Sequence, residues 1–266
     1  MTGRRNAPVV VAWHLLDSPR TEAAFAAALP MADLDAWRVY LALPMCGGRA
    51  PEGGAEELMR RAMRDAVVEV HGPIATQAAA ELEPVLAELR ETLGMGDGPV
   101  ALVGGSLGAA VVQLVLAEGS TPVAAAVLIS PLVQLRPVVR MMSGLFGVEY
   151  AWSPESERIA DRLDFVARAP EIARRGRPPL LLVVGAEDDA DAFLAPARAL
   201  ADALRASDEN GATPVALETV PGMGHAPAEE PGVEPSPQTP AARDVDRRTV
   251  DWLSRHLGAR RADQLL

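Results

Sequence analysis

Short apolar runs alternate with alanine- and leucine-rich helical patterns along the chain, and this alternation constrains the fold more than any other feature. Such an alternation is typical of a parallel β-sheet covered by helices on both faces. We expect strands over residues 8–15, 37–43, 99–105, 123–130, 179–185 and 214–220. We expect helices over residues 20–29, 73–93, 107–118, 190–206 and 243–257. The predicted class is α/β, with about six mainly parallel strands.

Two segments interrupt the alternation. Residues 131–178 separate two predicted strands by far more than the usual connection in an α/β protein. Because they follow the carboxyl end of the fourth predicted strand, we expect them to form a helical cap above a site at that end. Residues 226–242 are rich in proline and glutamate, a composition that favours a flexible surface loop. No linker or internal repeat divides the chain, so we expect one domain over residues 1–266.

A G-x-S-x-G pentapeptide joins the third predicted strand to the helix after it, with the sequence Gly104-Gly105-Ser106-Leu107-Gly108. A serine at such a strand–helix turn projects its hydroxyl from the top of the sheet. The two outer positions need glycine because side chains there would collide with the neighbouring strands. We therefore predict that Ser106 is a nucleophile; the alternative is a glycine-rich turn with no catalytic role.

A serine nucleophile needs a base within hydrogen-bond reach, and the base needs an acceptor that fixes its tautomer. His225 lies in a glycine-rich turn just past the last predicted strand. Since the carboxyl ends of parallel strands meet at one edge, His225 and Ser106 should meet there. Three carboxylates follow the fifth strand, at Glu187, Asp188 and Asp189. We assign Asp188 as the acceptor and keep Asp189 as its substitute; alternatively, all three stabilise the start of a helix.

A tetrahedral intermediate also needs two donors for its oxyanion. The backbone N–H of Leu107, at the amino end of the helix after the pentapeptide, is the first candidate. The second should come from the loop after the first strand, near Leu15 or Leu16. Both donors are backbone groups, so the identity of the side chains says little about them.

Composition excludes several kinds of chemistry. All 25 basic residues are arginine, so there is no lysine for a Schiff base, a P-loop or a serine–lysine dyad. The single cysteine, Cys46, excludes an intrachain disulfide, a CxxC redox centre and a cysteine-rich metal site. The net charge of −11 opposes binding to nucleic acid or anionic membranes. No apolar stretch approaches the roughly 20 residues of a membrane span, and we expect a cytoplasmic protein.

The order of Ser106 in its pentapeptide, then Asp188, then His225 resembles the serine–acid–histidine order of the α/β-hydrolase superfamily. Compact members similar to dienelactone hydrolases and to prolyl-oligopeptidase-like peptidases and esterases are the nearest in character. The likeness covers nearly the whole chain. Dienelactone hydrolases use a cysteine nucleophile, whereas this chain has serine. Family members often carry His-Gly after the first strand, whereas this chain has His14-Leu15, so its oxyanion loop is expected to differ.

The resemblance implies roles for residues outside this trio. His14 would shape the loop after the first strand, buried and hydrogen-bonded, rather than act as the base. Leu16 would complete the oxyanion hole with Leu107. His14 and Leu15 are also candidates to line the substrate pocket. Four residues of the predicted cap either contact an apolar substrate or form the cap's own small core: Met141, Met142, Phe146 and Trp152.

The expected function is hydrolysis of a carboxylic ester or thioester of a small to medium apolar molecule, through an acyl-enzyme on Ser106. Short peptides are the alternative substrates within this class. The non-hydrolytic alternatives are a ligand-binding protein, an acid–base cyclase or lyase on the same fold, and an interaction module. The expected partner is a small-molecule acyl substrate, and the chemistry requires neither metal nor organic cofactor. Abundant alanine, arginine and proline without lysine indicate a GC-rich bacterial genome, while no pattern indicates an oligomeric state.

Overall fold

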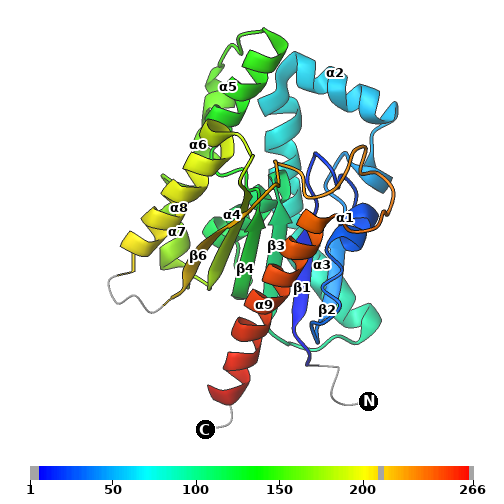
Figure 1. Cartoon of the computed structure of the whole chain (residues 1–266), viewed down its shortest axis with the longest axis vertical. Coiled ribbons are helices and arrows are strands. Elements are labelled where there is room, and N and C mark those ends of the chain that lie inside the picture. The colour runs from blue at the N-terminus through cyan, green and yellow to red at the C-terminus, as the bar shows by residue number, and fades with distance from the viewer. Residues whose placement is uncertain (1–5, 209–212, 264–266) are drawn as a thin grey trace.

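The computed structural model describes residues 6–208 and 213–263, with side chains described as far as Leu257. Within these residues six parallel strands form one sheet in the order β2-β1-β3-β4-β5-β6 (Figure 1). The strands are β1 (Val9–Trp13), β2 (Trp37–Leu41), β3 (Val100–Gly105), β4 (Val123–Ile129), β5 (Leu180–Gly185) and β6 (Val215–Val220). Each lies within the residues predicted for it, and the α/β class with a parallel sheet is confirmed.

Side chains along the inner strands alternate between two apolar clusters, one on each face of the sheet. In β1, Val9, Val11 and Trp13 belong to one cluster, and Val10 and Ala12 belong to the other. The side chains of β3 and β5 divide in the same way. Because both faces are buried, an inner strand needs an apolar residue at every position. This explains why the strand segments read as continuous apolar runs.

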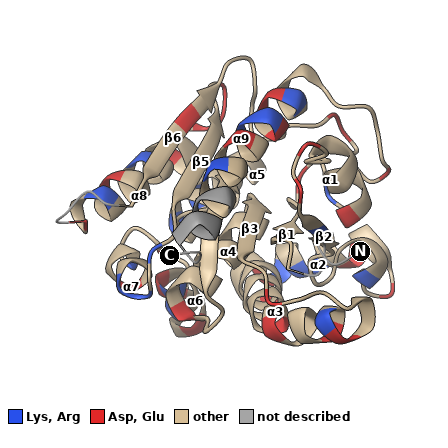
Figure 2. Cartoon of the chain, turned by 90° about the horizontal axis from the view of Figure 1, so that it is seen from below, with Lys and Arg blue, Asp and Glu red and all other residues tan. Residues whose placement is uncertain are grey.

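Helices cover both faces of this sheet, as the view from below shows (Figure 2). Two of them pack on one face: α1 (Glu22–Ala28) and α9 (Pro240–Asp263). Four lie on the other: α3 (Gly72–Leu93), α4 (Leu107–Glu118), α7 (Ala169–Arg174) and α8 (Ala195–Ala206). Charged residues gather on these helices and on the loops, whereas β1, β3, β4 and β5 contain none.

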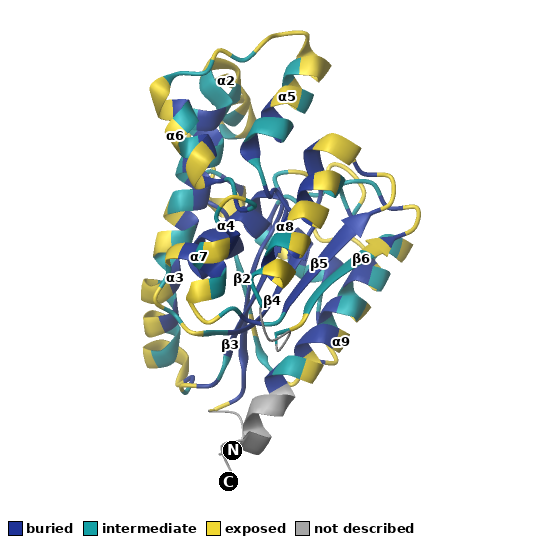
Figure 3. Ribbon diagram, turned by 90° about the vertical axis from the view of Figure 1, so that its left-hand side faces the viewer, coloured by how far each residue is buried: buried dark blue, intermediate teal, exposed yellow. Residues whose placement is uncertain are grey.

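Helices α2 (Gly54–Ala66) and α5 (Leu135–Phe146) project beyond the carboxyl ends of the strands, at the end of the molecule opposite the start of β1 (Figures 1 and 3). Helix α6 (Pro154–Arg162) packs beside them against the π-helical turn η2 (Val67–His71). Helix α7, by contrast, packs against α4 and α8 beside the sheet. The segment predicted as the cap therefore contributes two projecting helices, and the β2–β3 connection adds α2 and η2. The single-domain assignment stays a prediction.

Strand β1 lies at the point where the order of the strands reverses. The chain passes from β1 to β2 on one side and crosses back to β3 on the other. The loops after two strands diverge at such a point and leave a crevice at their carboxyl ends, where ligands bind in α/β proteins. Trp13 of β1 is paired with Gly104 of β3. The loop after β1 and the turn that holds Ser106 therefore leave the sheet side by side, at this switch point.

Candidate active site

Ser106 occupies the sharp turn between β3 and α4, with φ 46° and ψ −111°. A serine at positive φ is strained, and such strain is common at functional sites. A Cβ on Gly108 would lie 2.5 Å from the carbonyl oxygens of Trp13 and His14, so the close approach of α4 to β1 requires glycine. A Cβ on Gly104 would lie 2.3 Å from the carbonyl oxygen of Gly108. Glycine at 104 is thus required by the following helix rather than by a neighbouring strand.

The side chains of Ser106, His225 and Asp188 are joined by hydrogen bonds into one continuous line, with His225 in the middle. His225 Nε2 lies 2.9 Å from Ser106 Oγ, and His225 Nδ1 lies 2.9 Å from Asp188 Oδ2. A carboxylate accepts hydrogen bonds but does not donate them, so Nδ1 carries the proton and Nε2 can accept from the serine hydroxyl. This is the tautomer that a general base requires. The line joins the turns that follow β3, β5 and β6.

The loops after β5 and β6 hold the imidazole in place. The backbone N–H of Glu187 donates to the carbonyl of Met223 at 2.9 Å, which ties the two loops together. The ring of Phe193 packs against the ring of His225 with 3.9 Å between their centroids. The imidazole is therefore fixed by an aromatic ring beside it and by a hydrogen bond at each nitrogen.

Two adjacent carboxylates after β5 have different partners. The side chain of Asp188 is 2% exposed, and its Oδ1 accepts from the backbone N–H of Asp189 at 2.8 Å. The carboxylate of Asp189 accepts instead from the N–H groups of Asp191 and Ala192, as the N-cap of the next helical turn. Of the two acids considered from the sequence, Asp188 is the one that contacts His225.

The predicted oxyanion hole pairs the backbone N–H groups of Leu107 and Leu16. Leu107 is the first residue of α4, and N–H groups in the first turn of a helix have no acceptor within that helix. The helix dipole also favours negative charge at this end. Leu16 is half-buried in the loop after β1. The roles of these two groups stay predictions.

His14 and Leu15 do not line a substrate pocket, so this prediction is wrong. His14 is fully buried; its Nδ1–H donates to the carbonyl of Leu15 at 2.6 Å, and its Nε2 accepts from the N–H of Leu43 at 3.0 Å. Burial lowers the pKa of His14, which keeps the imidazole neutral. Leu15 is also fully buried, in the space that Gly105 leaves open. These side chains turn inward and shape the loop, as the resemblance implies for His14.

The four predicted pocket residues of the cap fall into two groups. Met141 and Trp152 are half-buried and pack against the core, and Trp152 makes an edge-to-face contact with Tyr150 at 4.8 Å between centroids. Met142 and Phe146 are 38% and 53% exposed on α5. The first pair therefore supports the cap's own packing, and only the second pair is free to contact a ligand.

Asp17 lies at this site but was not predicted from the sequence. Its Oδ2 is 3.7 Å from His225 Nε2, the nitrogen that faces Ser106, and its side chain is 57% exposed. Asp17 follows Leu16 directly in the loop predicted to supply an oxyanion donor. This position next to Leu16 could have indicated Asp17 from the sequence, because every side chain of this loop starts close to the nucleophile.

A strap, residues 229–233, ties the chain after His225 to the loop after β1. Ser18 and Thr21 donate hydroxyl hydrogen bonds to carbonyl groups of the strap. The backbone N–H of Arg20 donates to the carbonyl of Gly232 at 2.8 Å. The strap belongs to the segment that is predicted to be flexible. These contacts restrain it, and its flexibility stays a prediction.

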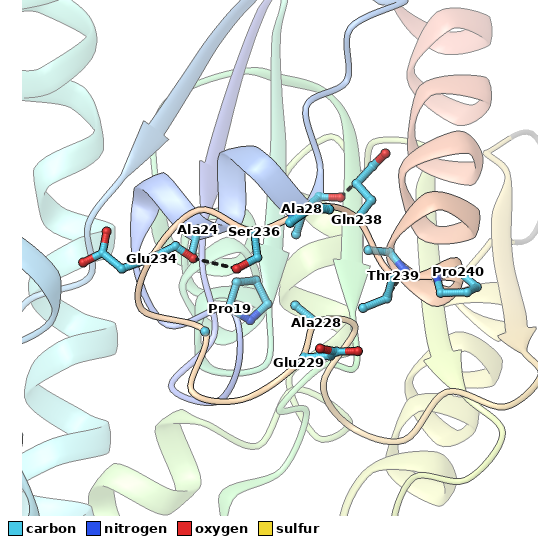
Figure 4. A pocket seen from close by; sticks show the side chains of 13 residues that line it. Pro19, Ala24, Ala28, Ala228, Glu229, Glu234, Ser236, Gln238, Thr239 and Pro240 are labelled. Carbon is cyan, nitrogen blue, oxygen red and sulfur yellow. Dashed lines mark hydrogen bonds between the residues drawn. The ribbon is translucent and has the colours of Figure 1, made fainter.

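A separate cavity of about 390 Å³ lies between α1 and the proline-rich segment (Figure 4). Pro19, Ala24 and Ala28 form one part of its wall, and none of the three hydrogen-bonded site residues belongs to the wall. Two polar side chains in the wall already have partners, because Gln238 donates to the carbonyl of Ala28 and Thr239 donates to a carbonyl of its own segment. We therefore assign this cavity no ligand.

A protein metal site of this kind needs at least three His, Cys, Asp or Glu side chains close together. The part of the chain that the structure describes contains no such cluster. No helix in that part of the chain is long and apolar enough to cross a membrane. Cys46 is a free, buried thiol, and burial raises its pKa to about 11.

A sequence profile of the prolyl oligopeptidase family matches residues 83–260, about two thirds of the chain. This range contains Ser106, Asp188 and His225. No curated protein sequence matches the chain.

Solved structures with the same fold cover nearly all of the chain. TT1662 from Thermus thermophilus has a TM-score of 0.64 and 21% identity, over 94% of this chain and 90% of its own. A monoacylglycerol lipase from Paleococcus ferrophilus has a TM-score of 0.55 and 16% identity, over 93% and 94%. A puromycin-hydrolyzing peptidase from Mycobacterium tuberculosis has a TM-score of 0.55 and 17% identity, over 94% of this chain but 35% of its own. The predicted α/β-hydrolase fold is confirmed.

Proposed function

This chain belongs to the prolyl oligopeptidase family of serine hydrolases, and from that premise we propose that it cleaves a carboxylic ester or thioester of a small to medium apolar molecule through an acyl-enzyme on Ser106. The observation that carries the proposal is the hydrogen-bonded line in which His225 lies 2.9 Å from both Ser106 Oγ and Asp188 Oδ2. A serine hydroxyl becomes an effective nucleophile only beside such an oriented base.

In the proposed reaction, Ser106 Oγ attacks the acyl carbonyl carbon while His225 Nε2 takes the hydroxyl proton. Asp188 stabilises the imidazolium that forms and keeps its orientation. The N–H groups of Leu107 and Leu16 donate to the oxyanion. The leaving alcohol or thiol takes the proton from His225 as its bond to carbon breaks. Water then attacks the acyl-enzyme with His225 as base, which releases the acid and restores Ser106.

Exposed apolar side chains on the two projecting helices support an apolar substrate. Met59 and Met63 on α2 are 55% and 61% exposed, and Met142 and Phe146 are exposed on α5. Both helices project beyond the carboxyl ends of the strands (Figure 3). Methionine side chains adapt to apolar ligands of different shape. A short peptide is the second candidate substrate, because the family whose profile matches is that of prolyl oligopeptidase.

A fluorophosphonate probe tests the proposed nucleophile. We expect labelling of Ser106 in the native protein, located by peptide mass spectrometry, and none in Ser106→Ala. Ser130→Ala is the matched control, because Ser130 also follows a strand end at positive φ but its buried hydroxyl has no hydrogen-bond partner. No labelling of the native protein, or equal labelling in Ser106→Ala, would exclude the acyl-enzyme.

A panel of acyl esters, thioesters and aminoacyl arylamides then separates esterase, thioesterase and peptidase activity. In parallel, Asp188→Asn should lower kcat by about 10³- to 10⁴-fold because the imidazole loses its tautomer, whereas Asp189→Asn should change it less than about twofold. Ligand-dependent thermal stabilisation without turnover would indicate a binding protein instead. Turnover that survives in Ser106→Ala would indicate an acid–base reaction on His225.

A further inference from the structure

The carboxylate of Asp17 lies at the reacting face of the proposed site and has no cationic partner there. Its Oδ2 is 3.7 Å from His225 Nε2, and Nε2 is 2.9 Å from Ser106 Oγ. Asp17 Oδ2 is therefore no more than about 6.6 Å from the nucleophilic oxygen, as those two distances require. Among the described residues, no arginine lies within 4.0 Å of Asp17.

The neighbours of Asp17 do not balance its charge. His225 is the neutral base in the proposed resting state. His71, the other imidazole that interacts with Asp17, is held neutral because burial lowers its pKa more than the charge of Asp17 raises it. Arg20, the closest arginine along the chain, forms its ion pair with Glu230 of the strap. The resting site therefore presents a half-exposed negative charge beside the place where a substrate carbonyl must bind.

From this arrangement we propose that Asp17 determines specificity, by selecting acyl groups that carry an ammonium close to the scissile carbonyl and by disfavouring anionic ones. The inference rests on the proposed serine-hydrolase function and names a charge preference within it. An α-ammonium nitrogen lies about 2.5 Å from its carbonyl carbon, by standard bond lengths. The carbonyl carbon lies about 3–3.5 Å from the attacking oxygen in a reactive complex. An amino-acid ester whose ammonium points toward the loop after β1 thus falls within reach of Asp17.

The loop that carries Asp17 is also held in place by contacts on both of its sides. It is anchored on one side by the buried imidazole of His14 and on the other by the strap through Ser18 and Thr21. Since the backbone is held, only the Asp17 side chain has to be ordered when a cation binds. A charge-assisted contact to a group on a held loop is stronger than one between two mobile surface segments.

The test compares two benzyl esters of nearly the same shape. Alanine benzyl ester is mostly cationic at pH 7, since an α-amino group has a pKa of about 7.8, and isobutyric acid benzyl ester is its neutral counterpart. Release of benzyl alcohol gives kcat/KM for each ester at low ionic strength. In Asp17→Asn, we expect the ratio of kcat/KM for the cationic ester to kcat/KM for the neutral ester to fall about tenfold from its wild-type value. Intrinsic differences between the esters cancel in this comparison.

Two further arms separate specificity from a structural effect. The monobenzyl ester of succinic acid carries a carboxylate, and its kcat/KM should rise in Asp17→Asn, a gain that a damaged site would not produce. Asp191→Asn makes the same charge change at an exposed position of the helical turn after β5 and should leave kcat/KM for all three esters unchanged. Added salt should reduce the wild-type preference, because it screens a half-exposed charge.

Each outcome decides one question. An unchanged ratio in Asp17→Asn, or an equal loss on both esters, would overturn the specificity role while Ser106-dependent release still supports the proposed function. If the wild type cleaves neither ester but fluorophosphonate labels Ser106, protection by alaninamide and by isobutyramide gives the same comparison, and equal protection overturns the inference. If Ser106 is not labelled, the proposed function fails and the inference fails with it.

Discussion

The turn beside Ser106 allows a stability experiment whose outcome follows from one contact. A Cβ added at Gly105 would lie 2.2 Å from Leu15 Cδ1 and 2.8 Å from Leu15 Cγ, and its third neighbour is also an atom of the Leu15 side chain. Gly105 has no positive φ, so alanine is compatible with its backbone. The obstacle to Gly105→Ala is therefore a single leucine side chain rather than the backbone.

The magnitudes follow from burial. Leu15 is fully buried and cannot move into solvent, so Gly105→Ala should cost about 1–3 kcal/mol of the free energy of unfolding, as is usual for an overpacked core. Leu15→Ala alone should cost about 2–5 kcal/mol through lost burial and the cavity that remains. The double variant removes the collision and partly fills that cavity. Its cost should therefore be smaller than the sum of the single costs by about 1–3 kcal/mol.

The assay is urea unfolding followed by tryptophan fluorescence. The wild type, the two single variants and the double variant are fitted with one shared m-value and compared. Leu29→Ala is the matched control, because Leu29 is fully buried in the same apolar cluster but does not contact Gly105. Combined with Gly105→Ala, it should be additive within about 0.5 kcal/mol. Additivity in the Leu15 cycle as well would refute the reasoning, since it would show that the leucine does not limit the space at this turn.

Three further predictions follow from burial and backbone geometry. With its pKa raised to about 11, Cys46 should be about 0.1% thiolate at pH 8, so iodoacetamide should alkylate it about a hundredfold more slowly in the native state than in urea. Burial lowers the folded-state pKa of His14 and His71. Below pH 6.5 the unfolded state therefore binds more protons than the folded state, so the free energy of unfolding should fall as the pH decreases. The slope should approach about 1.4 kcal/mol per pH unit for each histidine. His14→Gln should remove about half of that slope in urea titrations at several pH values, and an unchanged slope would contradict the assignment. Gly232→Ala should lower the urea midpoint more than Gly222→Ala, because both glycines have positive φ but only a Cβ at 232 collides with the loop after β1.

The sequence predicted the sheet well because the physical cause of the pattern is local and repeated. A strand buried on both faces is apolar at every position, as in β5, so each run was visible without knowledge of its partners. The three hydrogen-bonded site residues could be predicted from the sequence for a related reason. Ser106, Asp188 and His225 each lie within a few residues of a strand end, and parallel strands bring those ends to one edge.

The parts that were not predicted depend on how loops fold. Whether His14 and Leu15 point inward or outward depends on contacts with Leu43 and Gly105, which are distant in the sequence. No periodicity specifies such contacts. The pocket assignment for these two was therefore wrong, and Asp17 was missed.

The cap shows the same limit on a larger scale. Asp65 leaves the helical region, with φ −161° and ψ 97°, and its carboxylate accepts from the N–H groups of Val67 and Val68. The same carboxylate accepts from the hydroxyl of Tyr150, in the connection between α5 and α6. One side chain thus ends α2, starts the π-helical turn and joins the two projecting segments. Helical propensity alone does not reveal a connection between residues 85 positions apart.

The candidate site is held together mainly by hydrogen bonds between backbone groups of neighbouring loops. The N–H of Ser106 donates to the carbonyl of Ile129 at the end of β4, and the N–H of Glu187 donates to the carbonyl of Met223 before His225. Such contacts do not depend on side-chain identity, so the loops can vary in sequence while the trio keeps its geometry. The residue that is not fixed by the trio's chemistry is Asp17, on the loop after β1. A fold organised in this way can change its substrate at that loop without disturbing the base or the nucleophile, which agrees with the specificity role proposed for Asp17.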